Sequence, residues 1–212
     1  MAGRRQRVFC ASLADVFDNQ VPSEWRVDLF RLIKATPDLD WLLLTKRIGM
    51  VTPRLLESLK WGATSDPDLA YWIGCWFDGH PPANVWIGGT ITSQAEADRD
   101  IPKLLAVPAR VRFLSMEPLL GPVDLSFIDI NGDSEIYPLR GTTGCVDEEG
   151  EPAPDLPALD WVIVGGESGP GARPMHTDWA RSLRDQCEAA GTPFLFKQWG
   201  EWLPWDQFNA AQ

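Results

Sequence analysis

The sequence predicts an α/β fold, namely a partial TIM-type (β/α) barrel with about six parallel strands and covering helices. Short apolar runs recur along the 212 residues at intervals that leave room for a helix, and each run ends in polar or charged residues. The runs are continuous rather than alternating, which is typical of parallel strands buried on both faces. The six runs are 8–11, 41–44, 85–87, 111–114, 161–164 and 193–196.

Helical patterns fill most of the intervals between these runs. In the first, Ser23 is placed to cap a helix over residues 24–35, whose apolar side chains recur at helical spacing. In the last, Gly191 is placed to end a helix that begins near Trp179. Two more helices are expected, over residues 52–59 and from Thr92 through Leu105. The aromatic stretch 60–83 is expected to be irregular.

The length favours one domain over residues 1–212. Six units of about 35 residues fall short of the roughly 250 residues that a full eight-stranded barrel needs, so we expect a partial barrel. Residues 126–157 interrupt the repeat with acidic side chains among glycine and proline. We interpret this segment as an irregular acidic insertion that contains a small hairpin.

Composition narrows the class of protein. The formal net charge of -11 argues against general nucleic-acid binding, although it leaves a local basic patch open. The four cysteines are scattered without a CxxC pair, so we expect neither a disulfide framework nor a metal site. No apolar run approaches the about 20 residues that cross a bilayer. We therefore expect a cytoplasmic protein without membrane contact.

The polar residues that follow the apolar runs are the candidate site. Side chains at the carboxyl ends of neighbouring parallel strands face one mouth, and in such folds ligands bind there. A mouth that holds both acids and bases suits a zwitterion. The candidates are Ser12, Asp15, Lys46, Arg47, Thr92, Ser93, Gln94, Ser115, Glu117, Glu167, Ser168, Lys197 and Gln198.

The run Gly165-Gly166-Glu167-Ser168-Gly169 is the most specific of these segments. Paired glycines let backbone N–H groups approach a ligand, but a structural turn explains them equally well. Two interpretations of Glu117 are open: its carboxylate could bind a ribose hydroxyl or a metal, or it could brace the loop. Lys46 and Arg47 could hold a carboxylate or phosphate or be surface charges, and Lys197 has the same two readings.

Taken together, several segments resemble a phage-associated family that belongs with the radical S-adenosylmethionine barrels. The resemblance implies S-adenosylmethionine or a related nucleotide-like ligand at the strand ends. The segments that carry it are 8–17, 44–47, 85–88, 112–121, 161–169 and 196–200.

The resemblance also implies roles for single residues. By position, Ser12 and Asp15 would face the amino group of the cofactor, and Thr92 and Ser93 its ribose. Glu117, Gly165, Gly166 and Glu167 complete the expected cofactor set. Lys46, Arg47 and Lys197 are the expected substrate-binding residues. No catalytic residue is assigned.

In the family that the chain resembles, a CxxxCxxC loop after the first strand holds an iron–sulfur cluster. The sequence contains no such loop. We therefore expect a chain that is cut or naturally reduced at both ends, and a cluster only with the missing N-terminal segment. Whether the protein is an enzyme depends on whether that segment exists. The sequence does not indicate a substrate.

Two alternatives remain from the sequence. One is a non-catalytic phage accessory or binding protein that keeps the barrel without the cluster, with the open strand edge at 8–11 as a candidate homodimer contact. The other is a metal-dependent hydrolase that uses Asp15, Glu117, Glu167 and His176, although no recognisable ligand pair is present.

Overall fold

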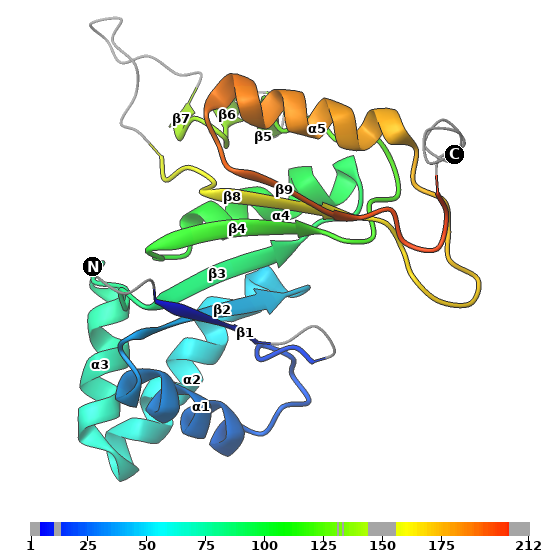
Figure 1. Cartoon of the computed structure of the whole chain (residues 1–212). Coiled ribbons are helices and arrows are strands. Elements are labelled where there is room, and N and C mark those ends of the chain that lie inside the picture. Colours follow the sequence, from blue (N-terminus) through cyan, green and yellow to red (C-terminus); the bar gives the residue numbers. More distant parts are fainter. Residues whose placement is uncertain (1–4, 11–13, 131, 133, 144–155, 204–212) are drawn as a thin grey trace, which may run out of the picture. The chain divides into compact units, whose positions relative to one another are not determined.

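The computed structural model describes residues 5–10, 14–130, 132, 134–143 and 156–203 (Figure 1). By its internal contacts the chain divides into two compact units, one formed by residues 1–89 and 106–112 and the other by 90–105 and 113–212. That the chain forms a single domain stays a prediction.

The first unit contains three parallel strands and the helices that follow them. β2 pairs with β1 on one side and with β3 on the other, in a register that aligns Val8, Trp41 and Val85. The elements are β1 (Gln6–Cys10), α1 (Ser23–Ala35), β2 (Leu39–Thr45), the short 3₁₀ helix η1 (Ile48–Met50), α2 (Val51–Ser65), α3 (Pro67–Phe77) and β3 (Val85–Thr90).

The helices α1, α2 and α3 lie against one another, as Figure 1 shows. Their contact is built from aromatic rings, because Trp72 and Trp76 of α3 and Phe30 of α1 approach within 6.4 Å between centroids. Phe30 and Ile73 are fully buried. The large apolar area that these side chains remove from water stabilises the layer.

The prediction that residues 60–83 are irregular is wrong. α2 continues to Ser65, and α3 occupies 67–77. The signal was present in the sequence: Asp66 caps α3 by accepting the Leu69 N–H at 3.1 Å, and Pro67 stands at the first helical position. The abundant aromatic side chains obscured this helix start.

The second unit also contains three parallel strands, because β8 pairs with β4 on one side and with β9 on the other. α5 packs along β8 and β9 (Figure 1). The elements are α4 (Gln94–Ala106), β4 (Val111–Met116), β5 (Ile128–Ile130), β6 (Ser134–Tyr137), β7 (Thr142–Thr143), β8 (Trp161–Gly165), α5 (Thr177–Ala190) and β9 (Phe194–Gln198).

The insertion contains more order than a hairpin. Within its described residues, β5, β6 and β7 form a three-stranded antiparallel sheet. Ile128 and Ile136 are cross-strand partners and both are buried, so one face of this small sheet has an apolar core. The acidic residues at 147–155 lie outside the described residues.

The predicted fold class, a partial (β/α) barrel with about six parallel strands and covering helices, is confirmed. Each of the six apolar runs overlaps a strand, and the runs at 41–44 and 161–164 are almost wholly buried. The predicted helices at 24–35 and 179–190 correspond to α1 and α5. Gly191 ends α5 at φ 73°, as its position in the sequence indicated.

Candidate functional site

A polar cluster stands at the carboxyl ends of β4, β8 and β9 in the second unit. The Glu117 carboxylate follows β4 and accepts a hydrogen bond from Lys197 Nζ at 2.8 Å and from Gln198 Nε2 at 3.0 Å. Gln198 Nε2 also lies 3.1 Å from the Ser168 hydroxyl, in the loop after β8. We name Glu117, Ser168, Lys197 and Gln198 the strand-end cluster.

An irregular register in β9 makes this cluster feasible. Val164 pairs with Phe196, but the next residue, Gly165, pairs with Gln198, so Lys197 is an extra residue in the ladder. In a regular strand, consecutive side chains point to opposite faces. A bulge breaks that alternation and re-aims a side chain. It brings Lys197 and Gln198 to the same carboxylate.

Gly165 provides the space for the Glu117 side chain. A Cβ atom at Gly165 would lie 3.0 Å from Glu117 Oε1 and 3.2 Å from its carboxyl carbon. The loop after β4 is also tied to the end of β8, because the Leu119 N–H donates to the Gly165 carbonyl at 3.0 Å. The first glycine of the predicted motif therefore serves the cluster by leaving room for the acid.

Gly166 has a different role from its neighbour. Its N–H donates to the Gln198 carbonyl at 2.9 Å, and a Cβ atom there would overlap the Trp199 carbonyl. Gly200, at φ 84°, approaches the Glu167 backbone in the same way. These glycines let two backbones meet, so the Gly166 N–H is already engaged within the protein.

Glu167 is held by Arg173 rather than by the strand-end cluster. The two groups form a bidentate pair, with Nε 2.8 Å from Oε2 and Nη2 2.7 Å from Oε1, and the Arg173 N–H donates to Oε2 at 2.8 Å. These donors lower the pKa of Glu167 to about 2. The pair closes the loop between β8 and α5.

Thr92 and Ser93 lie where α4 begins. The Thr92 N–H and hydroxyl both donate to Glu96 Oε2, at 2.7 and 2.8 Å, and the Thr92 carbonyl accepts from the Leu120 N–H at 2.9 Å. The loop that carries Glu117 therefore contacts both Thr92 and Gly165. The structure brings Thr92, Glu117 and Gly165 to neighbouring positions, as predicted for strand-end residues.

In the first unit, Asp15, Lys46 and Arg47 come together at the end of β2. Asp15 accepts from the Phe17 N–H at 3.0 Å, the Thr45 hydroxyl at 2.9 Å, the Lys46 N–H at 3.0 Å and, more weakly, Arg47 Nη1 at 3.4 Å. Its oxygens are occupied by protein donors, so the geometry is that of a loop brace. The Lys46 side chain is exposed. Ser12 lies outside the described residues.

The described part of the chain does not fit an iron–sulfur cluster. Over those residues, no group of three or more His, Cys, Asp or Glu side chains could hold a metal ion. Cys187 is buried in α5, and burial raises its pKa to about 11. Burial also raises the pKa of Cys10. A thiolate, the form that binds iron, is disfavoured at both positions.

His176 does not join Glu117 or Glu167. Its Nδ1 accepts the Asp178 N–H at 3.2 Å and caps α5. His176 is therefore a helix cap. The four-residue set of the hydrolase alternative is not assembled in the second unit, since Asp15 belongs to the first.

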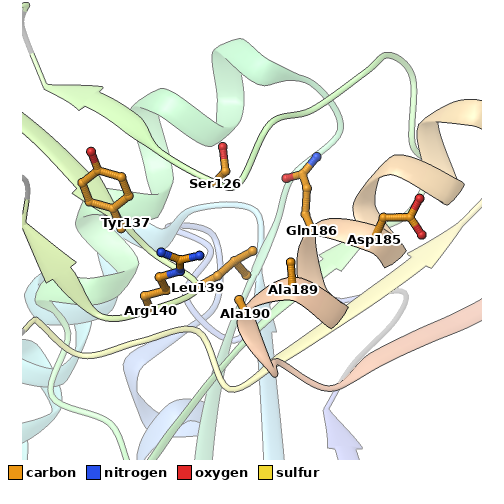
Figure 2. A pocket seen from close by; sticks show the side chains of 8 residues that line it. All are labelled: Ser126, Tyr137, Leu139, Arg140, Asp185, Gln186, Ala189 and Ala190. Carbon is orange, nitrogen blue, oxygen red and sulfur yellow. The ribbon is translucent and has the colours of Figure 1, made fainter.

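A hollow of about 390 Å³ lies between α5 and the small antiparallel sheet, and Figure 2 shows the side chains around it. Tyr137, Leu139 and Arg140 line one side, and Gln186 faces them from α5. The Gln186 amide is engaged with backbone, because it donates to the Val123 carbonyl at 3.1 Å and accepts from the N–H of residue 125 at 2.6 Å. None of the predicted site residues lines this hollow.

Sequence reasoning missed Arg173 entirely. It lies in a loop, and nothing in its spacing links it to Glu167. Ser168 and Gln198 were among the strand-end polar residues but received no role, because a bulge in β9 is not visible in the sequence. Lys197 and Glu117 were both selected, and the structure pairs them.

The fold and the cluster define an α/β protein with six parallel strands and a charged, hydrogen-bonded group at strand carboxyl ends. Within the described residues, no helix is long and apolar enough to span a membrane. The chain belongs to the family DUF5131, described as "Protein of unknown function", whose model matches residues 2–212. Neither a curated protein nor a solved structure matches the chain.

Proposed function

We propose that this protein binds a small zwitterionic, nucleotide-like ligand at the carboxyl ends of β4, β8 and β9, with S-adenosylmethionine as the leading candidate. One observation carries the proposal. A bulge in β9 re-aims Lys197 so that a base, an amide and an acid meet at the edge where parallel α/β folds bind ligands.

The strand-end cluster has the chemistry that an amino-acid group requires. Glu117 can accept from a ligand ammonium, and Lys197 can donate to a ligand carboxylate. The two side chains are 22% and 53% exposed, so a ligand can reach both. A partly exposed ion pair contributes little stability, about 0–1 kcal/mol, so exchanging it for ligand contacts costs little.

Further contacts extend the proposal beyond the amino-acid group. The Ser93 side chain is half-buried at the start of α4, next to Thr92, and the two hydroxyls would bond a ribose. Glu167, Gly165 and Gly166 flank the same edge. In the first unit, Lys46 and Arg47 follow β2, and we assign them to substrate. That Ser12 and Asp15 face the amino group of the cofactor stays a prediction from the resemblance.

The relationship to radical S-adenosylmethionine barrels and to phages is part of this proposal and is supported by the sequence resemblance. The described residues do not fit the iron–sulfur cluster of that class. The proposed function is therefore ligand binding, and no radical step is assigned to the residues described.

Isothermal titration calorimetry with S-adenosylmethionine tests the proposal. We expect Glu117→Gln and Lys197→Met each to weaken binding about tenfold, because each removes a charge-assisted contact. Glu188→Gln and Lys103→Met are matched controls: Glu188 is an exposed acid on α5, and Lys103 pairs with Asp100 on α4. The proposal would be contradicted if the control variants lost as much affinity for S-adenosylmethionine, or if the unaltered chain did not bind it.

A second candidate is a non-catalytic accessory protein that assembles through β1. The observation that favours it is an open edge: β1 pairs with β2 and stands at the end of its strand order, and Phe9 is 45% exposed. An unpaired edge is a template for another strand. Light scattering tests this candidate, which requires a dimer in the unaltered chain and a monomer after Val8→Pro.

A further inference from the structure

A second hollow, of about 310 Å³, lies between α5 and β9 in the second unit. It does not include the strand-end cluster. Its walls combine aromatic rings with guanidinium groups, a composition found in sites that stack bases and hold phosphates. The hollow is lined by Ala180, Arg181, Arg184, Phe194, Phe196 and Trp199.

The local structure explains how these side chains come together. Phe194 and Phe196 are two residues apart in β9, so both rings point to the face that α5 covers. Arg181 and Arg184 are three residues apart on α5, which places them on one helical face. Trp199 follows β9, with its ring centroid 4.5 Å from that of Phe196 at an interplanar angle of 55°.

Both guanidinium groups are paired with exposed carboxylates, and Arg181 also donates to the Thr177 hydroxyl at 3.2 Å. Arg181 lies 3.2 Å from an Asp178 oxygen, and Arg184 lies 2.6 Å from an Asp185 oxygen. The arginine side chains are 45% and 54% exposed and the two carboxylates more so. Exposed pairs of this kind contribute about 0–1 kcal/mol, so a phosphate of higher charge can take their place.

We propose that this hollow binds a nucleoside monophosphate, with the base against Phe196 and Trp199 and the phosphate at Arg181 and Arg184. Its volume is at the lower end of small-molecule pockets, which suits one base. The site is separate from the strand-end cluster, because none of the four residues of that cluster lines the hollow. The inference therefore does not rest on the proposed S-adenosylmethionine site.

Calorimetric titration of the full chain with adenosine 5′-monophosphate, adenosine and ribose 5-phosphate tests the inference. The monophosphate should bind more tightly than either half alone. Arg184→Gln should weaken its binding about tenfold and remove the advantage over adenosine. Phe196→Leu, which keeps apolar volume but removes the ring, should weaken binding about fivefold.

Matched controls make the result specific. Arg110→Gln removes an exposed arginine elsewhere, and Phe127→Leu removes an exposed ring outside the hollow. Both should leave the affinity unchanged. An affinity that falls in Lys197→Met but not in Arg184→Gln would place the nucleotide at the strand-end cluster and overturn the inference. Equal binding of ribose 5-phosphate and the monophosphate would also overturn it.

Discussion

Lys197 Nζ lies 2.8 Å from Glu117 Oε2, although 80 residues separate the two in the chain. The contact depends on two local features, the extra residue in β9 and the missing side chain at Gly165. Neither is a property of the charged residues themselves. The backbone geometry of β8 and β9 thus allows the two charged side chains of the candidate site to meet.

The two glycines after β8 should respond differently to alanine. At Gly165 the added Cβ meets the side chain of Glu117 and no backbone atom, so Gly165→Ala should stay folded but displace the acid and weaken ligand binding. At Gly166 it meets the rigid Trp199 backbone, so Gly166→Ala should destabilise the fold by about 3 kcal/mol or more. Thermal unfolding with calorimetry on both variants checks this. Equal loss of stability in the two would contradict it.

The Glu167–Arg173 pair should survive to low pH. Because its donors lower the pKa of Glu167 from 4.5 to about 2, the stabilisation is fully present above about pH 4.5 and is lost as the pH falls through 2. Carbon-13 NMR titration of the Glu167 carboxyl measures this directly. Arg173→Met should return the pKa toward 4.5. An unaltered chain that already titrates near 4.5 would refute the pairing.

Arg26 should be a strong stabiliser of the first unit. Its guanidinium is buried and donates to the carbonyls of Val16, Asp18 and Val21 at 3.0 to 3.3 Å, so it holds the loop before α1. Arg26→Met removes all three of these hydrogen bonds and should lower the free energy of unfolding by about 3 kcal/mol. Urea unfolding measures the change.

Arg31→Met is the control for that substitution, because Arg31 is 39% exposed and pairs with Asp66 at the surface. We expect its cost to stay below about 1 kcal/mol. If both variants lost a similar free energy of unfolding, burial of the Arg26 guanidinium would not be the source of its stabilising effect.

Cys187 should be unreactive in the folded protein. It is fully buried and its pKa is raised to about 11, so little thiolate is present at pH 8. Alkylation with iodoacetamide followed by peptide mass spectrometry should modify Cys75 before Cys187. Cys187 should react only after unfolding. Rapid native modification of Cys187 would contradict the packing of α5.

Substitution of Asp15 should lower the stability of the protein even when no ligand is present. Asp15→Asn removes the charge that accepts from Thr45, Lys46 and Arg47, and we expect a loss of about 1–2 kcal/mol. Thermal unfolding without ligand measures this. If ligand binding is lost while stability is unchanged, Asp15 contacts the ligand and its bracing role is secondary.

The strands were predictable because burial on both faces leaves a continuous apolar run, as in Trp41–Leu44. The helix at 67–77 was missed because its aromatic residues masked an ordinary capped start. For the site, strand-end position selected Glu117 and Lys197, and the structure pairs these two side chains. Strand-end position could not predict Arg173, because the pair with Glu167 depends on how the loop between them folds back. Nor could it predict the engagement of Gly166, because that depends on a backbone contact with Gln198, which is distant in sequence.

The most direct measurement is an NMR titration with S-adenosylmethionine that follows the side-chain amide of Gln198, which bonds both Glu117 and Ser168. If the ligand binds at the strand-end cluster, this resonance should shift and saturate with a dissociation constant below about 1 mM. In Glu117→Gln the dissociation constant obtained from this shift should rise about tenfold. A ligand that binds without moving this resonance, or that does not bind, would contradict the account.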